Sequence, residues 1–184
     1  MKSMFLTGFL TAALMVAGAA TGAAGNAPKS DAEIEKAVTH EVRMYPQYGI
    51  WDDVSFRVAN GQVELFGAVN QPYKKQDIER LVRRVPGVTS VTSELKVLPL
   101  SSFDDRLRIQ IARAIYGSPA LSRYGMQANP PIHIIVDNGH VTLTGWVNSD
   151  MEKQIAGIRA SGAGLSFGAV TNNLQVEHPA AKRG

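Results

Sequence analysis

The sequence predicts an α+β protein with two tandem small αββαβ modules, each a three-stranded mixed sheet packed against two helices, after an N-terminal signal peptide. The first observation behind this prediction is an internal repeat, because NGQVELFGAVNQ at 60–71 returns as NGHVTLTGWVNS at 138–149. The second is that segments with apolar residues at helical spacing precede and follow each copy of this phrase. The third is that alternating, strand-like segments at 91–97 and 170–176 end the two copies.

Each repeated phrase predicts a β-hairpin. Apolar residues alternate on both sides of an Asn-Gly pair, which favours a two-residue turn because glycine adopts positive φ without steric cost. Two further glycines fall within strands, where glycine indicates the close approach of another element. We expect that element to be a helix packed tightly over the sheet rather than a ligand. The predicted structural hairpin residues are Asn60, Gly61, Gly67, Asn138, Gly139 and Gly145.

Helical segments are predicted on either side of each hairpin. The capping box at 30–33 (SDAE) starts the first helix of the first copy, and residues 102–105 start the corresponding helix of the second. A second capping box, at 149–152 (SDME), opens the last helix, in which we expect Ile155 and Ile158 to be buried. That helix is predicted to be the weaker one, because a glycine lies inside it.

The first 25 residues have the layout of a Sec-type signal peptide. Lys2 supplies the only charge, and an uncharged apolar run and small residues follow. The alternative is an uncleaved anchor, although the second half of the run is mostly Ala and Gly and is weakly apolar for a span. Cleavage predicts a periplasmic or secreted protein. The predicted segments are a signal peptide at 1–25, domains at 26–99 and 100–178, and a C-terminal tail at 179–184.

The amino-acid composition excludes several kinds of chemistry and of partner. The 184 residues include no cysteine, which excludes disulfides, thiol chemistry and a lipid carried on cysteine. The formal net charge of +3 comes from 19 basic and 16 acidic residues, and this weak excess does not indicate a nucleic-acid partner.

The repeated unit resembles the BON domain, a small module found in tandem in bacterial envelope proteins such as the osmotically induced OsmY group. The resemblance rests on the N-G-x-V-x-L-x-G-x-V hairpin, the helices around it and the closing x-L-x-V strand, and it extends from about Asp31 to Val176. It implies a non-enzymatic envelope protein that contacts phospholipid surfaces and supports envelope integrity or osmotic-stress tolerance. The longer loop at 117–131 in the second copy is compatible with the family.

No catalytic or metal site is expected from the residues themselves. His40, His133, His140 and His178 lack the spacing of a metal site, and no GxSxG nucleophile elbow is present. The adjacent acidic pairs at 52–53 and 104–105 lie at the starts of elements, where carboxylates favour turns and helix dipoles. We therefore predict no enzyme activity and no cofactor.

The principal candidate site is an apolar strip on the helix that begins at residue 102. It lies away from the face expected to be buried, and arginines flank it, as in helices that bind a membrane surface or a partner protein. Packing of this strip against the first copy is an equally open alternative. The candidate lipid- or partner-binding residues are Arg106, Ile109, Ala112, Arg113 and Tyr116.

A secondary basic face is predicted on the second helix of the first copy. It could attract anionic headgroups, and the alternative is a solvated face balanced by Asp77 and Glu79. Its residues are Lys74, Lys75, Arg80, Arg83 and Arg84. The predicted partner is an anionic phospholipid membrane surface or an envelope protein, and the rival function is a protein–protein module that docks to such a partner or to itself.

Overall fold

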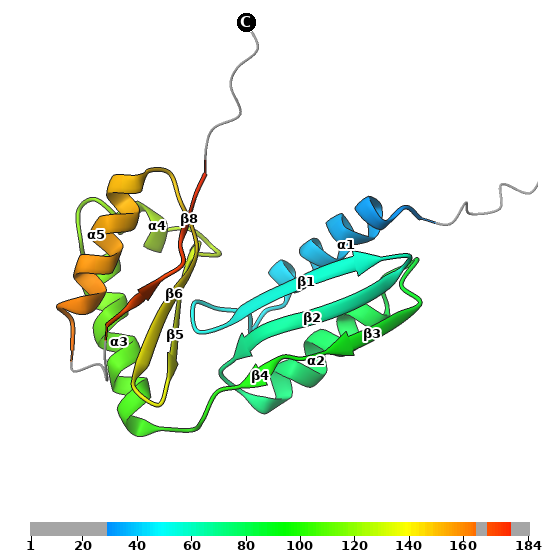
Figure 1. Ribbon diagram of the computed structural model, residues 1–184, viewed down its shortest axis with the longest axis horizontal. Helices are drawn as coiled ribbons and strands as arrows, with labels where there is room; N and C mark the ends of the chain where they lie inside the picture. The colour runs from blue at the N-terminus through cyan, green and yellow to red at the C-terminus, as the bar shows by residue number, and fades with distance from the viewer. Residues whose placement is uncertain (1–28, 165–168, 178–184) are drawn as a thin grey trace, which may run out of the picture.

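The computed structural model describes residues 29–164 and 169–177 and consists of two modules with the same order of elements, apart from one additional short helix in the second (Figure 1). Module 1 comprises α1 (Asp31–Met44), β1 (Asp53–Ala59), β2 (Gln62–Val69), α2 (Pro72–Arg83), β3 (Ser90–Ser93) and β4 (Lys96–Val97). Module 2 comprises α3 (Ser102–Tyr116), α4 (Ser122–Gly125), β5 (Ile132–Asp137), β6 (His140–Val147), α5 (Asp150–Ser161), β7 (Thr171–Asn172) and β8 (Gln175–Val176). The predicted α+β fold with two repeated modules is confirmed. The predicted signal peptide and tail lie outside the described residues.

Each sheet is mixed, as predicted. β1 and β2 pair antiparallel, and β3 and β4 both pair parallel to β2 on its other edge. The closing strand is therefore split in two, and the same arrangement recurs around β6 in module 2. A leucine lies in the break between the two short strands of each module and is buried in the core: Leu95 is 2% exposed and Leu174 is fully buried.

A carboxylate from the first helix of each module holds the hairpin turn. The central turn residues have positive φ: 51° and 75° at Asn60 and Gly61, 51° and 78° at Asn138 and Gly139. Asp31 accepts hydrogen bonds from the amides of Asn60 (2.7 Å) and Gly61 (2.9 Å). Asp104 accepts the same two bonds from the amides of Asn138 (2.9 Å) and Gly139 (2.8 Å). These aspartates connect the start of each helix to the far end of its hairpin.

The glycines within the strands are required by a neighbouring strand, so the prediction that a helix approaches them is wrong. Gly67 and Gly145 have φ of 113° and 97°. A Cβ at Gly67 would lie 2.1 Å from the carbonyl oxygen of Asp53, and one at Gly145 would lie 1.8 Å from that of Pro131. Both oxygens belong to the backbone at the start of the partner strand, so the glycines allow the hairpin to bend there.

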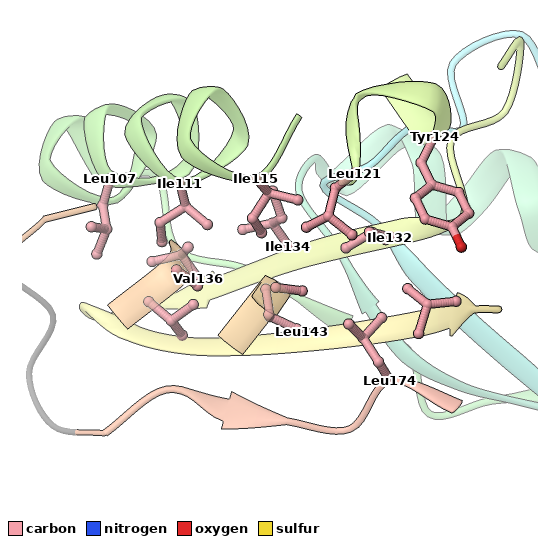
Figure 2. Packing of buried hydrophobic residues seen from close by; sticks show 14 residues of the cluster. Leu107, Ile111, Ile115, Leu121, Tyr124, Ile132, Ile134, Val136, Leu143 and Leu174 are labelled. Carbon is pink, nitrogen blue, oxygen red and sulfur yellow. The ribbon is translucent and has the colours of Figure 1, made fainter. Parts of the chain in front are cut away.

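Each module has its own hydrophobic core. In module 2, Leu107, Ile111 and Ile115 point from α3 toward β5 and β6, as Figure 2 shows. Tyr124, from α4 in the long loop, closes one end of this core and is 1% exposed. α4 was not predicted from the sequence, because its single turn carries no apolar periodicity of its own.

The last helix, α5, is rotated relative to the prediction. Its buried residues are Ala156 and Ala160, whereas Ile158 is 70% exposed and Ile155 is half-buried. Small residues allow the backbone of α5 to lie close to its neighbours, so the bulkier isoleucines turn outward. The N-cap bond from the Glu152 amide to Ser149 forms as expected, but the Glu152 carboxylate bonds elsewhere.

The two modules meet at the loop before β1 and the free edge of β5. The Ile134 amide donates to the Ile50 carbonyl oxygen at 2.7 Å, which extends the second sheet by one hydrogen bond into module 1. Trp51 belongs to the module 1 loop, yet its side chain packs against the module 2 core. Lys96 and Asp137 form an ion pair across the same boundary.

His133 is the titratable group at the centre of this boundary. Its Nδ1 lies 2.6 Å from the Asp52 carbonyl oxygen, and because a carbonyl only accepts, Nδ1 carries a proton and donates. Burial lowers the pKa of His133, although the hydrogen bond to Asp52 and the nearby Asp53 carboxylate partly oppose this shift. Burial also raises the pKa of Asp53, a shift that His133 opposes.

Candidate functional site

The candidate site is the outward face of α3. Ser101 caps the helix by accepting a hydrogen bond from the Asp104 amide at 3.2 Å. Because Leu107 and Ile111 face the sheet, residues half a turn away face outward at 100° per residue. Ile109 is 45% exposed there.

Arginines flank Ile109 and are available for binding. Arg106 and Arg113 are both exposed, and neither forms an ion pair within residues 29–164 and 169–177. Arg108, by contrast, is buried, where it pairs with Asp105 at 2.6 Å and donates to the Val136 carbonyl oxygen at 2.6 Å. Arg106, Ile109 and Arg113 therefore form an amphipathic face, hereafter the α3 face.

Ala112 and Tyr116 do not belong to the outward apolar strip in which they were predicted to lie. Both pack against the module 2 core. The Tyr116 hydroxyl donates to the Ile132 carbonyl oxygen, and Gly125 of the long loop lies against its ring. Burial raises the pKa of Tyr116 above its ordinary value. The prediction that Tyr116 faces outward is wrong, because the long loop folds back over the end of α3.

The alternative that the strip packs against the first module does not hold for Ile109. The described contacts between modules involve the loop before β1, β4 and the end of α1 in module 1, and β5 and the long loop before it in module 2. Figure 1 shows α3 and α5 on the side of the second sheet that faces away from module 1. Among the residues that the structure describes, none of module 1 covers the α3 face.

The secondary basic face of module 1 is broken up by internal bonds. Lys74 is buried and pairs with Asp52 at 2.7 Å, so the prediction that it faces outward is wrong. The Lys75 ammonium donates to the Leu95 carbonyl oxygen at 2.9 Å. Arg80 pairs with Asp77, Arg83 donates to the Val91 carbonyl oxygen, and Arg84 is exposed. Only part of the predicted charge is free to attract an anion.

The buried Lys74–Asp52 pair has a structural function that sequence reasoning missed. Asp52 also accepts a hydrogen bond from the Asn70 amide at 3.0 Å, at the point where β2 ends. In module 2 the equivalent amide, of Asn148, donates to the Tyr124 hydroxyl at 2.8 Å. That hydroxyl donates to Glu152, which stands where Lys74 stands in module 1. The amide at the end of the hairpin strand is therefore bonded in both modules, but the supporting helix residue is a cation (Lys74) in module 1 and a carboxylate (Glu152) in module 2.

No metal site accompanies these residues. In the part of the chain that the structure describes, no three histidine, aspartate or glutamate side chains lie close enough together to hold a metal ion. Within the same residues, no helix is both long enough and apolar enough to span a bilayer.

The repeated architecture and its hairpins match a known family. The BON domain family model matches the chain twice, at residues 30–99 and 109–178. The chain belongs to the BON domain family. The two matches stand in tandem, one on each module, so the repeat identified from the hairpins is a repeat of the BON domain. BON domains are generally non-enzymatic modules that interact with phospholipid membranes, and proteins that contain them are typically periplasmic or envelope-associated.

Two solved structures of CdsD, a structural protein of the type III secretion system of Chlamydia trachomatis, are similar to this tandem BON protein. One is 18% identical, over 81% of this chain and 94% of that chain, with a TM-score of 0.29. The other, of its C-terminal domain, is 17% identical, over 82% of this chain and 100% of that chain, with the same TM-score. Superpositions this loose carry no argument about function. None of the curated proteins matches the chain.

Proposed function

We propose that this tandem BON protein is a non-enzymatic, exported envelope protein that binds anionic phospholipid surfaces through module 2. The observation that carries the proposal is the α3 face, where exposed Ile109 lies between Arg106 and Arg113, neither of which has an ion-pair partner among the described residues. Lipid phosphates satisfy the guanidinium groups, and Ile109 enters the interfacial region. Support of envelope integrity or of osmotic-stress tolerance follows as the cellular function.

The electrostatic part of this binding is expected to be modest and sensitive to salt. A basic residue near an anionic surface contributes about 1 kcal/mol, so the two arginines together contribute about 2 kcal/mol, or roughly 30-fold in affinity. Added salt shortens the Debye length and screens this attraction, so binding to the vesicles should weaken as the ionic strength rises.

Vesicle flotation tests the proposal. Residues 26–184, the chain expected after signal-peptide cleavage, should float with phosphatidylglycerol vesicles and remain behind with neutral phosphatidylcholine vesicles. Arg106→Gln with Arg113→Gln should weaken binding about 30-fold. Lys29→Gln with Lys36→Gln removes the same charge from exposed positions of module 1 and should leave most of the binding intact. Equal loss in both variants would refute binding at the α3 face.

A protein partner is the second candidate, and one observation favours it. β1 is the outer strand of its sheet, and within the described residues no strand pairs with its free edge. Such an edge can accept an added strand from another protein. Solution size and capture from an envelope extract test this function, which predicts no dependence on anionic lipid.

A further inference from the structure

An exposed apolar strip runs along α5. Met151, Ile155 and Ile158 are spaced four and three residues apart, which places them on one face of the helix. Met151 is 71% exposed and Ile158 is 70% exposed, and Ile155 is half-buried beside them. An isoleucine exposed in the middle of a well-formed helix requires explanation when smaller residues of the same helix are buried.

The packing of α5 fixes this orientation. Ala156 and Ala160 face the core, and Gly157 faces Asn172, whose side-chain nitrogen would lie 2.9 Å from an added Cβ. That nitrogen also donates to the Lys153 carbonyl oxygen at 2.7 Å. A rotation of α5 that buried the isoleucines would break this bond and force larger side chains into space now filled by alanine and glycine. The exposed strip is therefore a fixed feature of the fold.

The strip and the α3 face belong to one layer of the molecule. α3 and α5 lie side by side over the same face of the second sheet, away from module 1 (Figure 1). Between them, Pro119 and Ala120 of the loop after α3 join Ile155, Ile158 and Arg159 around a shallow apolar hollow. The outer surface of the layer thus carries the exposed apolar side chains of Met151 and Ile158 on α5 and the exposed arginines Arg106 and Arg113 on α3, where the exposed carboxylate of Asp105 is paired with Arg108.

The charges of this layer select an anionic occupant. Arg159, like the arginines of the α3 face, forms no ion pair within the residues that the structure describes. The nearby Glu152 carboxylate is already paired with Arg123. A symmetric dimer through this layer would place the same patch on both partners and so bring arginines toward arginines. An anionic lipid surface neutralises them while also accepting the apolar strip.

We propose that Met151 and Ile158 insert into the interfacial region of an anionic bilayer, so that α3 and α5 lie flat on the membrane together. The proposal rests on the proposed function and extends it, since α5 supplies the apolar contact and α3 supplies much of the positive charge. Ile155 lies at the edge of the same contact, beside the loop that follows α3.

Titration with phosphatidylglycerol vesicles tests the α5 contact. In residues 26–184, Met151→Ser with Ile158→Ser should weaken binding by about 100-fold, roughly tenfold for each partly inserted side chain, and the loss should persist at high salt. The matched control is Met44→Ser with Tyr73→Ser, which removes two exposed apolar side chains (63% and 45%) from module 1 and should change affinity less than threefold. Unchanged thermal unfolding of both variants shows that the fold is retained.

The outcomes separate the two proposals. If the α5 variant binds as tightly as the unaltered chain while the Arg106/Arg113 variant is weakened, the proposed function survives and the α5 contact is refuted. If the unaltered chain binds no anionic vesicle, the proposed function fails and the α5 contact fails with it. If the α5 substitutions convert a dimer to a monomer and leave vesicle binding unchanged, the strip is an interface between copies and the lipid contact is again refuted.

Discussion

The carboxylate of Asp104 is expected to stabilise module 2 more than any other single polar group. It is fully buried and accepts hydrogen bonds from the amides of Asn138 and Gly139 at 2.9 and 2.8 Å. A hydrogen bond to a charged group contributes about 1.5–3 kcal/mol to stability. Asp104→Ala removes two of them and leaves at least one buried amide without a partner, so we expect a loss of about 3–5 kcal/mol.

Module 1 offers a matched comparison. Asp31 makes the same two bonds, and Asn60 is exposed and Gly61 buried just as Asn138 and Gly139 are, but Asp31 itself is partly exposed whereas Asp104 is buried. Water can approach the place of a partly exposed carboxylate more easily, so Asp31→Ala should cost less, about 1–3 kcal/mol. The difference between the two variants isolates the effect of burial on one repeated interaction.

Urea unfolding followed by tryptophan fluorescence measures the effect in module 2. The chain has two tryptophans, Trp51 and Trp146, and both pack against the module 2 core. Far-UV circular dichroism follows both modules together and detects any separate transition of module 1. The reasoning would be refuted if Asp104→Ala changed the free energy of unfolding by less than 1 kcal/mol, or if Asp31→Ala cost as much as Asp104→Ala.

Three further changes probe other parts of the fold. Lys74→Met should cost about 3–5 kcal/mol in the same unfolding assay because it leaves the buried Asp52 carboxylate without its ion-pair partner, and a loss below about 1 kcal/mol would contradict this. Gly145→Ala should cost at least about 2 kcal/mol, since its Cβ would lie 1.8 Å from the Pro131 carbonyl oxygen at a φ of 97°, and a soluble variant with unchanged melting would contradict this. Because burial lowers the pKa of His133, the unfolded chain binds more protons than the folded chain below about pH 6.5, so stability should fall as the pH drops from there toward the lowered pKa. His133→Gln should flatten that part of the melting profile, and an identical profile for the variant would exclude His133 as the cause.

Much of the fold could be predicted from the sequence because its signals are local. The Asn-Gly pairs require positive φ, and the capping box at the start of α1 forms as predicted, with Ser30 and Glu33 exchanging hydrogen bonds. Such features depend on a few neighbouring residues. The α3 face could be predicted for the same reason, since helical spacing alone places Ile109 opposite Leu107 and Ile111.

The main errors concern contacts between residues that are distant in sequence. Tyr116 lies on the outer side of α3 by periodicity, but the long loop covers it. Lys74 is a surface lysine by pattern, yet its ammonium is buried against Asp52, 22 positions earlier. α5 was expected to bury Ile158, and instead its alanines and the contact between Gly157 and Asn172 fix the opposite orientation. Hydrophobicity alone does not show which of two apolar faces a helix buries.

The depth of single side chains in a bilayer tests the central claim that module 2 binds anionic lipid through its helix layer. The absence of cysteine allows one environment-sensitive fluorophore to be placed at Ile158→Cys, and another at Arg57→Cys in module 1, where the native side chain is 74% exposed. With phosphatidylglycerol vesicles that carry a chain-attached quencher, the label at 158 should be quenched and the label at 57 should not. Quenching of neither label, or stronger quenching at 57, would contradict the account.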